Sequence, residues 1–422
     1  MSNNTRLAIL VAALGYFVDV YDLILFTILR VPSLTDLGFS GGQLVSQGSY
    51  LLNMQMGGFL VGGVVWGVVG DKIGRIELLF GSILLYSIGN ILNGFVGQFD
   101  AANAVMSPVG QYALLRLIAG FGLAGEIGGG ITLVSELLSK EARGYGTTIV
   151  VATGVAGAVV AAMVYKYFTW RGAYIAGGLL GLCLLALRMS VAESGVFKAL
   201  AERHHISRGN FFTLFTSSDR FMRYLNSILI GLPIWYSLGI VVTFSPEIAK
   251  ALGIVEPIAS ANSVFWFYCG ITAGSIANGL LSQWLRSRKL AVGLFLVGTV
   301  VMQGLIFHSG VTSASNFYSL IFGLGFATAY WAMLVTLAAE QFGTNLRATV
   351  ATSVPNFVRG ATVPMVMLSN FLKPSQGIVN SAEIVGLIAA ALALFALGML
   401  RETFGINLDY LEGEAETAKQ KA

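Results

Sequence analysis

The sequence predicts an all-α membrane protein with twelve transmembrane helices in two six-helix bundles. The first observation is composition: of 422 residues, 55% are hydrophobic and only 11% are charged, whereas soluble domains carry about 25% charged residues. The second is a series of apolar segments long enough to cross a bilayer, which takes about 20 residues per helix. The third is a polar stretch, residues 191–221, that divides these segments into two sets of six.

The apolar segments give the expected helices in order. In the first half they lie near 6–30, 47–70, 76–98, 110–138, 144–168 and 170–190. In the second half they lie near 222–246, 259–285, 289–309, 314–339, 347–371 and 381–401. We therefore expect an N-terminal bundle over 1–190, a cytoplasmic central loop over 191–221, a C-terminal bundle over 222–403 and a cytoplasmic tail over 404–422.

The distribution of Lys and Arg predicts the orientation, because cytoplasmic loops carry an excess of these bases. With an even number of spans and the N-terminus inside, most of the 25 Lys and Arg residues face the cytoplasm. Arg188 is placed on that side and Arg30 on the outside. The first apolar segment is too long for a signal peptide and contains acids. The sequence thus predicts a multi-pass protein of the cell (inner) membrane with both termini in the cytoplasm.

The two halves contain a repeated pattern. Glu136 and Arg143, in ELLSKEAR, have the same spacing as Glu340 and Arg347, in EQFGTNLR. Each pair closes the fourth span of its half and opens the fifth. The stretch GVVGDKIGR, from Gly67 to Arg75, has a faded copy after the second span of the second half. Duplicated six-helix halves are typical of transporters whose site lies between the halves near the middle of the membrane.

The stretch GVVGDKIGR also carries a family resemblance. It matches the pattern GxxxDxxGR[RK] of the major facilitator superfamily, except that Ile76 replaces the last base. With the twelve spans and the repeat, the chain resembles that superfamily over nearly its whole length. The stretches GYFVDVYDLILF, RLIAGFGLAGEIGGG, ESGVF and EQFGTNLRAT are similar to those of metabolite:proton symporters and organic ion transporters. The resemblance implies alternating access by rocking bundles and implies organic acids, betaines or sugar acids as substrates.

Charged residues within the apolar segments mark candidate substrate or proton pathways, because such charges are costly in a membrane. They are Asp19, Asp22, Arg116, Glu126 and Arg359. At 1.5 Å per residue, depth pairs Asp22 with Arg116 and places Asp19 opposite Glu126. Two acids that face one cavity suit a site that binds and releases protons. The resemblance implies that Asp22 and Arg116 are coupling residues. Alternatively, Asp22 and Arg116 only clamp two helices, and the other acids line the cavity without titrating.

Arg359 is the candidate substrate-binding residue. No acid lies at comparable depth in the second half, and a guanidinium can hold a carboxylate by two parallel hydrogen bonds. Alternatively, Arg359 pairs with an acid of the first half. Pro355 and Pro364 predict a kinked helix around it. The aromatic residues Tyr16, Trp235 and Tyr330 are further candidates for lining the cavity, although aromatic residues at helical spacing also serve packing.

Charges at the cytoplasmic ends of the helices predict a gate. In the first half the candidates are Asp71, Arg75, Glu136 and Arg143. In the second half they are Glu340 and Arg347, with Arg286 or Arg288. The charges would hold the cytoplasmic side closed in one state of the transport cycle. The alternative is that they are solvated loop charges that only fix the topology.

The sequence therefore predicts a secondary transporter that takes up a small organic anion, a carboxylate or sugar acid, with protons. The fifth span lacks the proline of exporter motifs, which favours uptake. The alternative is a carrier of a neutral or zwitterionic metabolite, such as a sugar, betaine or amino acid. A receptor would need a soluble signalling domain. No nucleophile or metal motif indicates an enzyme. We expect a monomer in the lipid bilayer with no cofactor, metal or nucleic acid.

Overall fold

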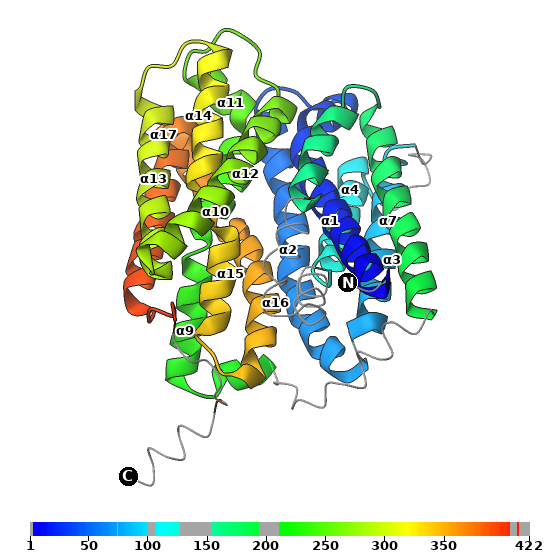
Figure 1. Ribbon diagram of the computed structural model, residues 1–422. Helices are drawn as coiled ribbons and strands as arrows, with labels where there is room; N and C mark the ends of the chain where they lie inside the picture. The colour runs from blue at the N-terminus through cyan, green and yellow to red at the C-terminus, as the bar shows by residue number, and fades with distance from the viewer. Residues whose placement is uncertain are drawn as a thin grey trace. The chain divides into compact units, whose positions relative to one another are not determined.

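The structure, a computed structural model, describes residues 3–73, 75–98, 106–126, 153–193, 211–405 and 412. Within these ranges every regular element is helical (Figure 1). The chain divides into two compact units. The first contains Met1–His205 and Ala259–Tyr268, and the second contains Ile206–Ile258 and Cys269–Ala422. The predicted all-helical membrane fold is confirmed.

The first unit is built from long, mostly continuous helices. They are α1 (Asn3–Asp36), α2 (Gly42–Ile73), α3 (Arg75–Asn93), α4 (Pro108–Leu123), a helix over Thr153–Val164 and α7 (Trp170–Glu193). The helix α2 packs on α4, α3 packs on α4 and α7, and α1 packs on α7. The start of α4 is fixed by Ser107, whose hydroxyl accepts a hydrogen bond of 3.2 Å from the Gly110 N–H. This packing brings polar side chains of α1, α3, α4 and α7 together.

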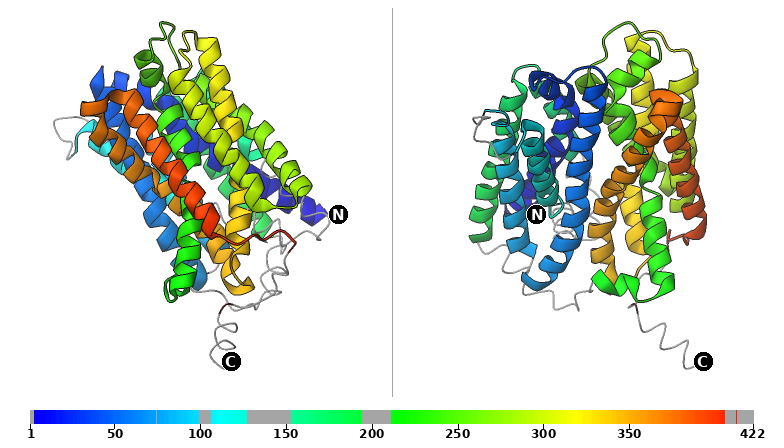
Figure 2. Two further views of the ribbon diagram at one scale, coloured as in Figure 1. Left: turned by 90° about the vertical axis from the view of Figure 1, so that its left-hand side faces the viewer. Right: turned by 180° about the vertical axis from the view of Figure 1, so that it is seen from behind.

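The second unit contains more and shorter helices. They are η1 (Phe211–Phe215), α9 (Ser218–Leu229), α10 (Leu232–Tyr236), η2 (Ser237–Val242), α11 (Ser245–Ala251), α12 (Ser260–Leu285), α13 (Arg288–His308), α14 (Ala314–Ala327), α15 (Trp331–Glu340), α16 (Thr344–Gly360) and α17 (Thr362–Met399). The first part of α12, up to Tyr268, is grouped with the first unit. The long α17 is two helices that meet at Gly377, where φ is 72°. Figure 2 shows its orange and red parts as separate rods.

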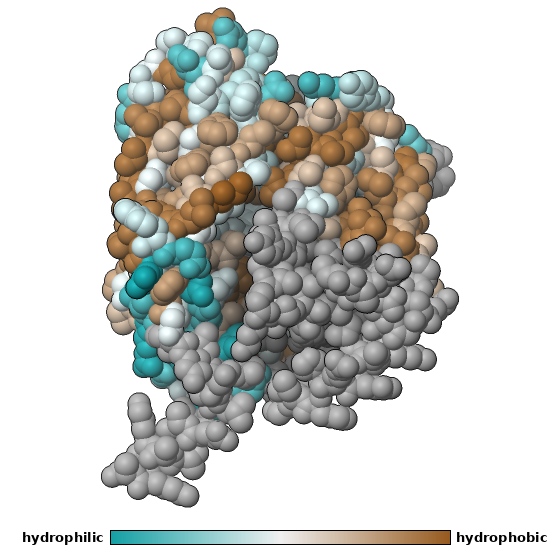
Figure 3. All heavy atoms as spheres, in the orientation of Figure 1, coloured by the Kyte–Doolittle hydropathy of each residue, from teal (hydrophilic) through white to brown (hydrophobic). Residues whose placement is uncertain are grey.

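Eight segments of the described residues are long and apolar enough to cross a membrane. Their outer faces are apolar as well. On α13, a stripe at three- and four-residue spacing leaves large apolar side chains 43–54% exposed; these are Leu290, Leu294, Val297, Val301 and Leu305. Figure 3 shows hydrophobic residues in brown along the side of the second unit where α13 lies. Lipid is the solvent in which such a surface is stable.

The two units repeat one packing device. On α2, Gly58 and Gly62 face backbone carbonyls of α4, so that a Cβ at either position would collide with them. On α12, Gly270 and Gly274 face backbone carbonyls of α14 in the same way. Glycines four residues apart allow membrane helices to approach closely. The same contact between the second and fourth spans of each half supports the internal duplication seen in the sequence.

Three spans of the second unit are interrupted. One break lies between α9 and α10, another between α14 and α15, and the third between α16 and α17. Proline explains the first and third, because Pro233 and Pro364 have no N–H to donate to the carbonyl four residues earlier. The predicted kink near Arg359 is therefore present. In transporters, interrupted spans form substrate sites, because their freed backbone groups face a cavity.

Candidate functional site

The first unit contains a buried polar centre beside α1. Asp19 and Asp22, from α1, and Arg116, from α4, are fully buried, and so is Asn90 from α3. Arg116 donates a hydrogen bond to the Asn90 amide oxygen. Its guanidinium carbon lies 4.7 Å from the centroid of the Tyr174 ring, on α7. Four helices therefore converge on one guanidinium in the interior of a single bundle.

Asp22 and Arg116 do not form the direct ion pair that the sequence predicted. Among the described residues, neither carboxylate oxygen of Asp22 accepts a hydrogen bond. Likewise, Arg116 Nε and Nη1 donate no hydrogen bond to a described residue. The Asn90 amide oxygen accepts from one N–H of the guanidinium, and the Tyr174 ring covers one of its faces. These two contacts explain why Arg116 does not pair directly with Asp22. The two charges remain close enough to interact electrostatically. Buried groups with open hydrogen-bonding positions are costly unless a proton, water or ligand uses them.

A glycine on α7 makes room for the acid. A Cβ at Gly177 would collide with Asp22 Oδ1 and would lie 2.9 Å from the Tyr21 ring. Only glycine lets the carboxylate lie directly against the α7 backbone. The position of Asp22 therefore depends on two helices, and the α7 contribution is visible in the sequence only as one glycine among many.

Glu126 is bound by an arginine that the sequence analysis had placed on the cytoplasmic surface. Arg188, on α7, forms an ion pair with Glu126 through two hydrogen bonds, one of them 3.0 Å from Nη1 to Oε2. Glu126 is 3% exposed and Arg188 is 5% exposed. Glu126 therefore has a base of its own, which the sequence did not predict; that Glu126 also faces Asp19 stays a prediction. The one signal in the sequence was that the apolar run continues to Met189 and Val191 beyond Arg188.

Tyr16 lies one turn before Asp19 and Val20 on α1 and is half-buried. Its ring packs directly against Gly154, where a Cβ would collide with it. The ring therefore connects α1 to the helix Thr153–Val164. The proposed role of Tyr16 in substrate binding stays a prediction.

In the second unit, Arg359 lies between two tryptophans. It is 2% exposed, and its guanidinium carbon lies 5.5 Å from the Trp235 ring centroid and 6.0 Å from that of Trp331. The two rings are 6.5 Å apart with an interplanar angle of 65°. A cation close to two indole faces is attracted by both ring quadrupoles. All three residues lie within five residues of an interruption in their helices, so the three breaks meet at this cluster.

Tyr330 makes a contact that the sequence did not predict, and its proposed role in substrate binding stays a prediction. It is fully buried, and its hydroxyl donates a hydrogen bond of 3.0 Å to the carbonyl oxygen of Ile230, which the break before α10 leaves free. This contact holds two interrupted helices together and uses the hydroxyl within the protein. Its neighbour Trp331 takes the position beside Arg359. Sequence reasoning missed Trp331, because the break before α15 determines which of the two adjacent aromatic residues faces the arginine.

The charges of the second half that the sequence assigned to the gate form part of the predicted cluster. Glu340 accepts hydrogen bonds of 2.7 Å from Arg288 Nη2 and 2.7 Å from Thr403, and Arg288 Nε lies 2.6 Å from its other carboxylate oxygen in an ion pair. Of the two bases left open by the sequence, Arg288 is therefore the partner. Arg347 donates a long hydrogen bond of 3.5 Å to the Phe342 carbonyl.

In the first half, the gate candidates cannot be placed in the same detail. Asp71 and Arg75 lie in α2 and α3, but their side chains are outside the described part of the chain. Glu136 and Arg143 also lie outside the described residues. The gate of the first half therefore stays a prediction.

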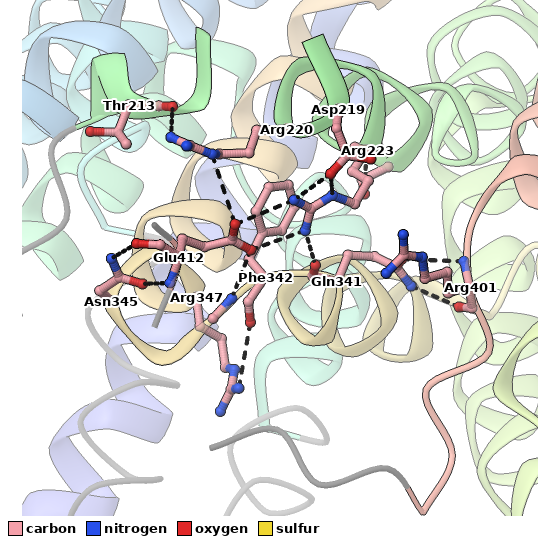
Figure 4. A network of polar contacts seen from close by, with 12 residues as sticks. Thr213, Asp219, Arg220, Arg223, Gln341, Phe342, Asn345, Arg347, Arg401 and Glu412 are labelled. Atoms are coloured by element: carbon pink, nitrogen blue, oxygen red, sulfur yellow. Dashed lines mark hydrogen bonds and ion pairs between the residues drawn. The ribbon is translucent and has the colours of Figure 1, made fainter. Parts of the chain in front are cut away.

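One residue of the predicted tail joins the end of the second unit at which α16 begins (Figure 4). Glu412 accepts hydrogen bonds of 3.0 Å from Arg223 and 3.2 Å from the Gly343 N–H at the start of α16. Arg220 approaches the same carboxylate at 3.8 Å. A carboxylate is favoured at a helix N-terminus, because the free N–H groups and the helix dipole attract it. The tail acid was not singled out in the sequence, where it is one of three glutamates in EGEAE.

Comparisons with known proteins agree with this architecture. A family model described as the Major Facilitator Superfamily matches residues 8–361. A probable 4-methylmuconolactone transporter of Cupriavidus pinatubonensis is 23% identical over 410 residues, covering 95% of this chain and 91% of the relative. A 3-(3-hydroxy-phenyl)propionate transporter of Escherichia coli is 26% identical over 372 residues, covering 84% and 87%. The crystal structure of a D-xylose-proton symporter matches with a TM-score of 0.69 at 17% identity, over 96% of this chain and 99% of that one.

Proposed function

The chain belongs to the Major Facilitator Superfamily, and we propose that it takes up a small organic anion together with protons. It is an integral multi-pass membrane protein and a secondary transporter of small metabolites, not an enzyme. The finer proposal rests on one observation: a buried arginine lies between two tryptophans where three interrupted helices meet. The proposal includes a cell (inner) membrane location with both termini cytoplasmic and a monomeric transporter.

Arg359 would bind the carboxylate of the substrate. A guanidinium is always charged at physiological pH and presents a planar fork that fits a carboxylate. The flanking indoles of Trp235 and Trp331 hold the fork in place and add apolar surface for the rest of the substrate. The relatives named for 4-methylmuconolactone and 3-(3-hydroxy-phenyl)propionate support a small, weakly polar organic compound.

Asp22 would bind the coupled proton. Its carboxylate has open hydrogen-bonding positions and lies near Arg116 in the interior of the first unit. When ionised, it is attracted to the arginine; when protonated, it loses that attraction and becomes a hydrogen-bond donor. The two protonation states therefore favour different arrangements of α1 and α4. Such a difference is what proton coupling requires, because a proton can shift only an equilibrium between states that bind it unequally.

The proposal is tested by uptake into proteoliposomes with an imposed pH gradient, acidic outside. The substrates would be 3-(3-hydroxyphenyl)propionate, nicotinate, glucuronate and a neutral sugar. We expect the gradient to drive uptake of at least one organic acid and Arg359→Gln to abolish it. The control is Arg401→Gln, since Arg401 is exposed and makes its recorded hydrogen bonds through its backbone. Gradient-driven uptake of the sugar alone would favour the alternative of a neutral metabolite.

A further inference from the structure

Three buried hydroxyl groups form a hydrogen-bonded file inside the first unit. The Ser33 hydroxyl lies 3.2 Å from the Tyr112 hydroxyl, which lies 2.7 Å from the Tyr174 hydroxyl. All three residues are fully buried and belong to α1, α4 and α7 respectively. We call these three groups the hydroxyl file. The next recorded contact at its inner end is Arg116, whose guanidinium lies against the Tyr174 ring.

The hydrogen bonds of the hydroxyl file share one direction. The Ser33 hydroxyl donates to the Arg30 carbonyl at 3.2 Å, so its oxygen accepts from Tyr112. Tyr112 then accepts from Tyr174, and the Tyr174 oxygen keeps a position for a donor from the side of Asp22 and Arg116. A hydroxyl both donates and accepts, so such a row can pass a proton along by exchanging which oxygen holds it.

The other end of the hydroxyl file lies near the surface. Ser33 is one turn before Asp36, the last residue of α1, whose side chain is 48% exposed. Asp36 pairs with Arg171 and accepts a hydrogen bond of 3.1 Å from the Trp170 indole. The orientation predicted from the sequence places this end of α1 outside the cell. The file therefore runs from the polar centre of the first unit toward an exposed carboxylate.

We propose that the hydroxyl file conducts protons between the outer end of α1 and Asp22, a proposal that rests on the proton coupling proposed above. The hydroxyls first rotate so that Ser33 donates to Tyr112, Tyr112 donates to Tyr174 and Tyr174 donates toward Asp22. A proton from the outer side then arrives at the Ser33 oxygen, each hydroxyl takes up one proton as it releases its own to the next, and Tyr174 releases its proton to the Asp22 carboxylate, directly or through one water molecule. The transfer leaves the hydroxyls in the outward-donating orientation of the structure, from which they rotate before the next proton. Only O–H bonds break and form, and no other reactant is needed.

Packing alone does not explain these hydroxyl groups. Phenylalanine would fill the same space as either tyrosine without burying a polar atom, which costs free energy unless it is hydrogen-bonded. The buried tyrosines Tyr21, Tyr236 and Tyr330 each donate to a backbone carbonyl, of Ala173, Ala382 and Ile230. By contrast, the hydroxyls of Tyr112 and Tyr174 bond to each other, which makes a continuous row.

The test follows protonation of Asp22 in proteoliposomes after a rapid drop in external pH. The readout is the infrared stretching band of the protonated carboxyl group, assigned to Asp22 by its loss in Asp22→Asn. We expect Tyr112→Phe to slow the rise of this band by roughly 10- to 100-fold while its final amplitude stays the same. The matched control is Tyr236→Phe, which removes a buried, hydrogen-bonded hydroxyl from the other unit.

Each outcome decides the proposal. A wild-type rate in Tyr112→Phe would overturn the hydroxyl file as a proton path and leave the proposed function intact. A change in amplitude at an unchanged rate would overturn it too, because the hydroxyl would then only set the equilibrium. If the wild type shows no band that responds to pH, the proposed proton coupling at Asp22 itself fails. Should Tyr112→Phe not fold, Ser33→Ala interrupts the same file with a smaller change.

Discussion

The two units of this transporter differ in the charges that they bury, because the first buries acids together with arginines and the second buries arginines without a comparable acid among its described residues. In the first unit, Asp19, Asp22 and Glu126 are each 3% exposed or less, and Arg116 and Arg188 are buried with them. Among the described residues of the second unit, no acid is buried to that degree, and Arg359 lies between two indole rings. The units share one ancestral packing pattern, so this difference reflects separate tasks. This is the division that we propose: proton exchange in the first unit and anion binding at Arg359 in the second.

The helices differ in the same way. In the first unit, α1 is continuous through Asp19 and Asp22, and α4 is continuous through Arg116. In the second unit, three spans break where Arg359 and its tryptophans lie. A titrating carboxylate needs a fixed position in a rigid bundle, whereas a substrate site needs backbone that can line a cavity. Variants in each unit should therefore have different consequences.

The largest expected effect is that of Asp22→Asn. The amide has nearly the same shape but cannot take up a proton, so net uptake driven by a pH gradient should fall to background. Exchange of labelled for unlabelled substrate across the membrane needs no net proton movement and should continue. Both rates are measured in the same proteoliposomes. If Asp22→Asn retains gradient-driven uptake, the assignment of proton coupling to the first unit is wrong.

The next effect concerns the buried pair in the first unit. Arg188→Met leaves Glu126 buried without its base, which costs about 3–5 kcal/mol of stability in comparable cases. Adding Glu126→Gln should restore part of that loss, because no uncompensated charge then remains. Thermal unfolding in detergent, followed by size-exclusion chromatography, measures both variants. Equal instability of the single and double variants would show that the two residues act independently.

Arg359→Lys should have a smaller effect that is confined to substrate binding. Lysine keeps the charge but lacks the planar fork, so the affinity for an organic acid should fall by about tenfold or more. Trp331→Phe weakens one cation–π contact, worth roughly 0.5–1 kcal/mol, and should cost only about two- to fivefold. Binding is measured by thermal shift across a concentration series. Loss of folding instead of affinity in Arg359→Lys would favour a partner for Arg359 within the protein.

The smallest effect lies at the end of the second unit at which α13 begins. Burial alone would raise the pKa of Glu402. Hydrogen bonds outweigh this effect and lower the pKa below its ordinary value of 4.5; they come from the Ser287 hydroxyl and from the N–H groups of Phe404, Arg288 and Lys289. Ionised Glu402 therefore stabilises the fold above about pH 4.5, and this contribution is lost as the pH falls through the lowered pKa. Glu402→Gln should accordingly show a flatter decline of its unfolding temperature between about pH 5 and pH 3. An unchanged decline would contradict the assignment.

The sequence predicted the parts of the site that depend on one helix at a time. Asp22, Arg116 and Arg359 were identified because a charge inside an apolar run is costly wherever the run packs. The helix kink beside Arg359 followed from its prolines. Arg188 was missed because it lies near the end of its span, where a base satisfies the orientation rule equally well on the surface.

Partners across helices could not be predicted. That Arg116 binds Asn90 depends on how α3 packs on α4, and several polar residues of α3 were equally available. That Trp331 and not Tyr330 faces Arg359 depends on the rotation introduced by the break before α15. These choices come from tertiary packing, which a single sequence taken by itself does not specify.

The most direct test of the divided site measures how many protons are taken up when the substrate binds. Calorimetric titration of the wild type with the organic acid selected by the uptake screen, in buffers of different ionisation enthalpy, gives that number. We expect about one proton per substrate in the wild type. In Asp22→Asn, where Arg359 is intact, we expect binding without proton uptake. Continued uptake of a proton by Asp22→Asn would contradict the central claim that the first unit holds the coupled proton at Asp22.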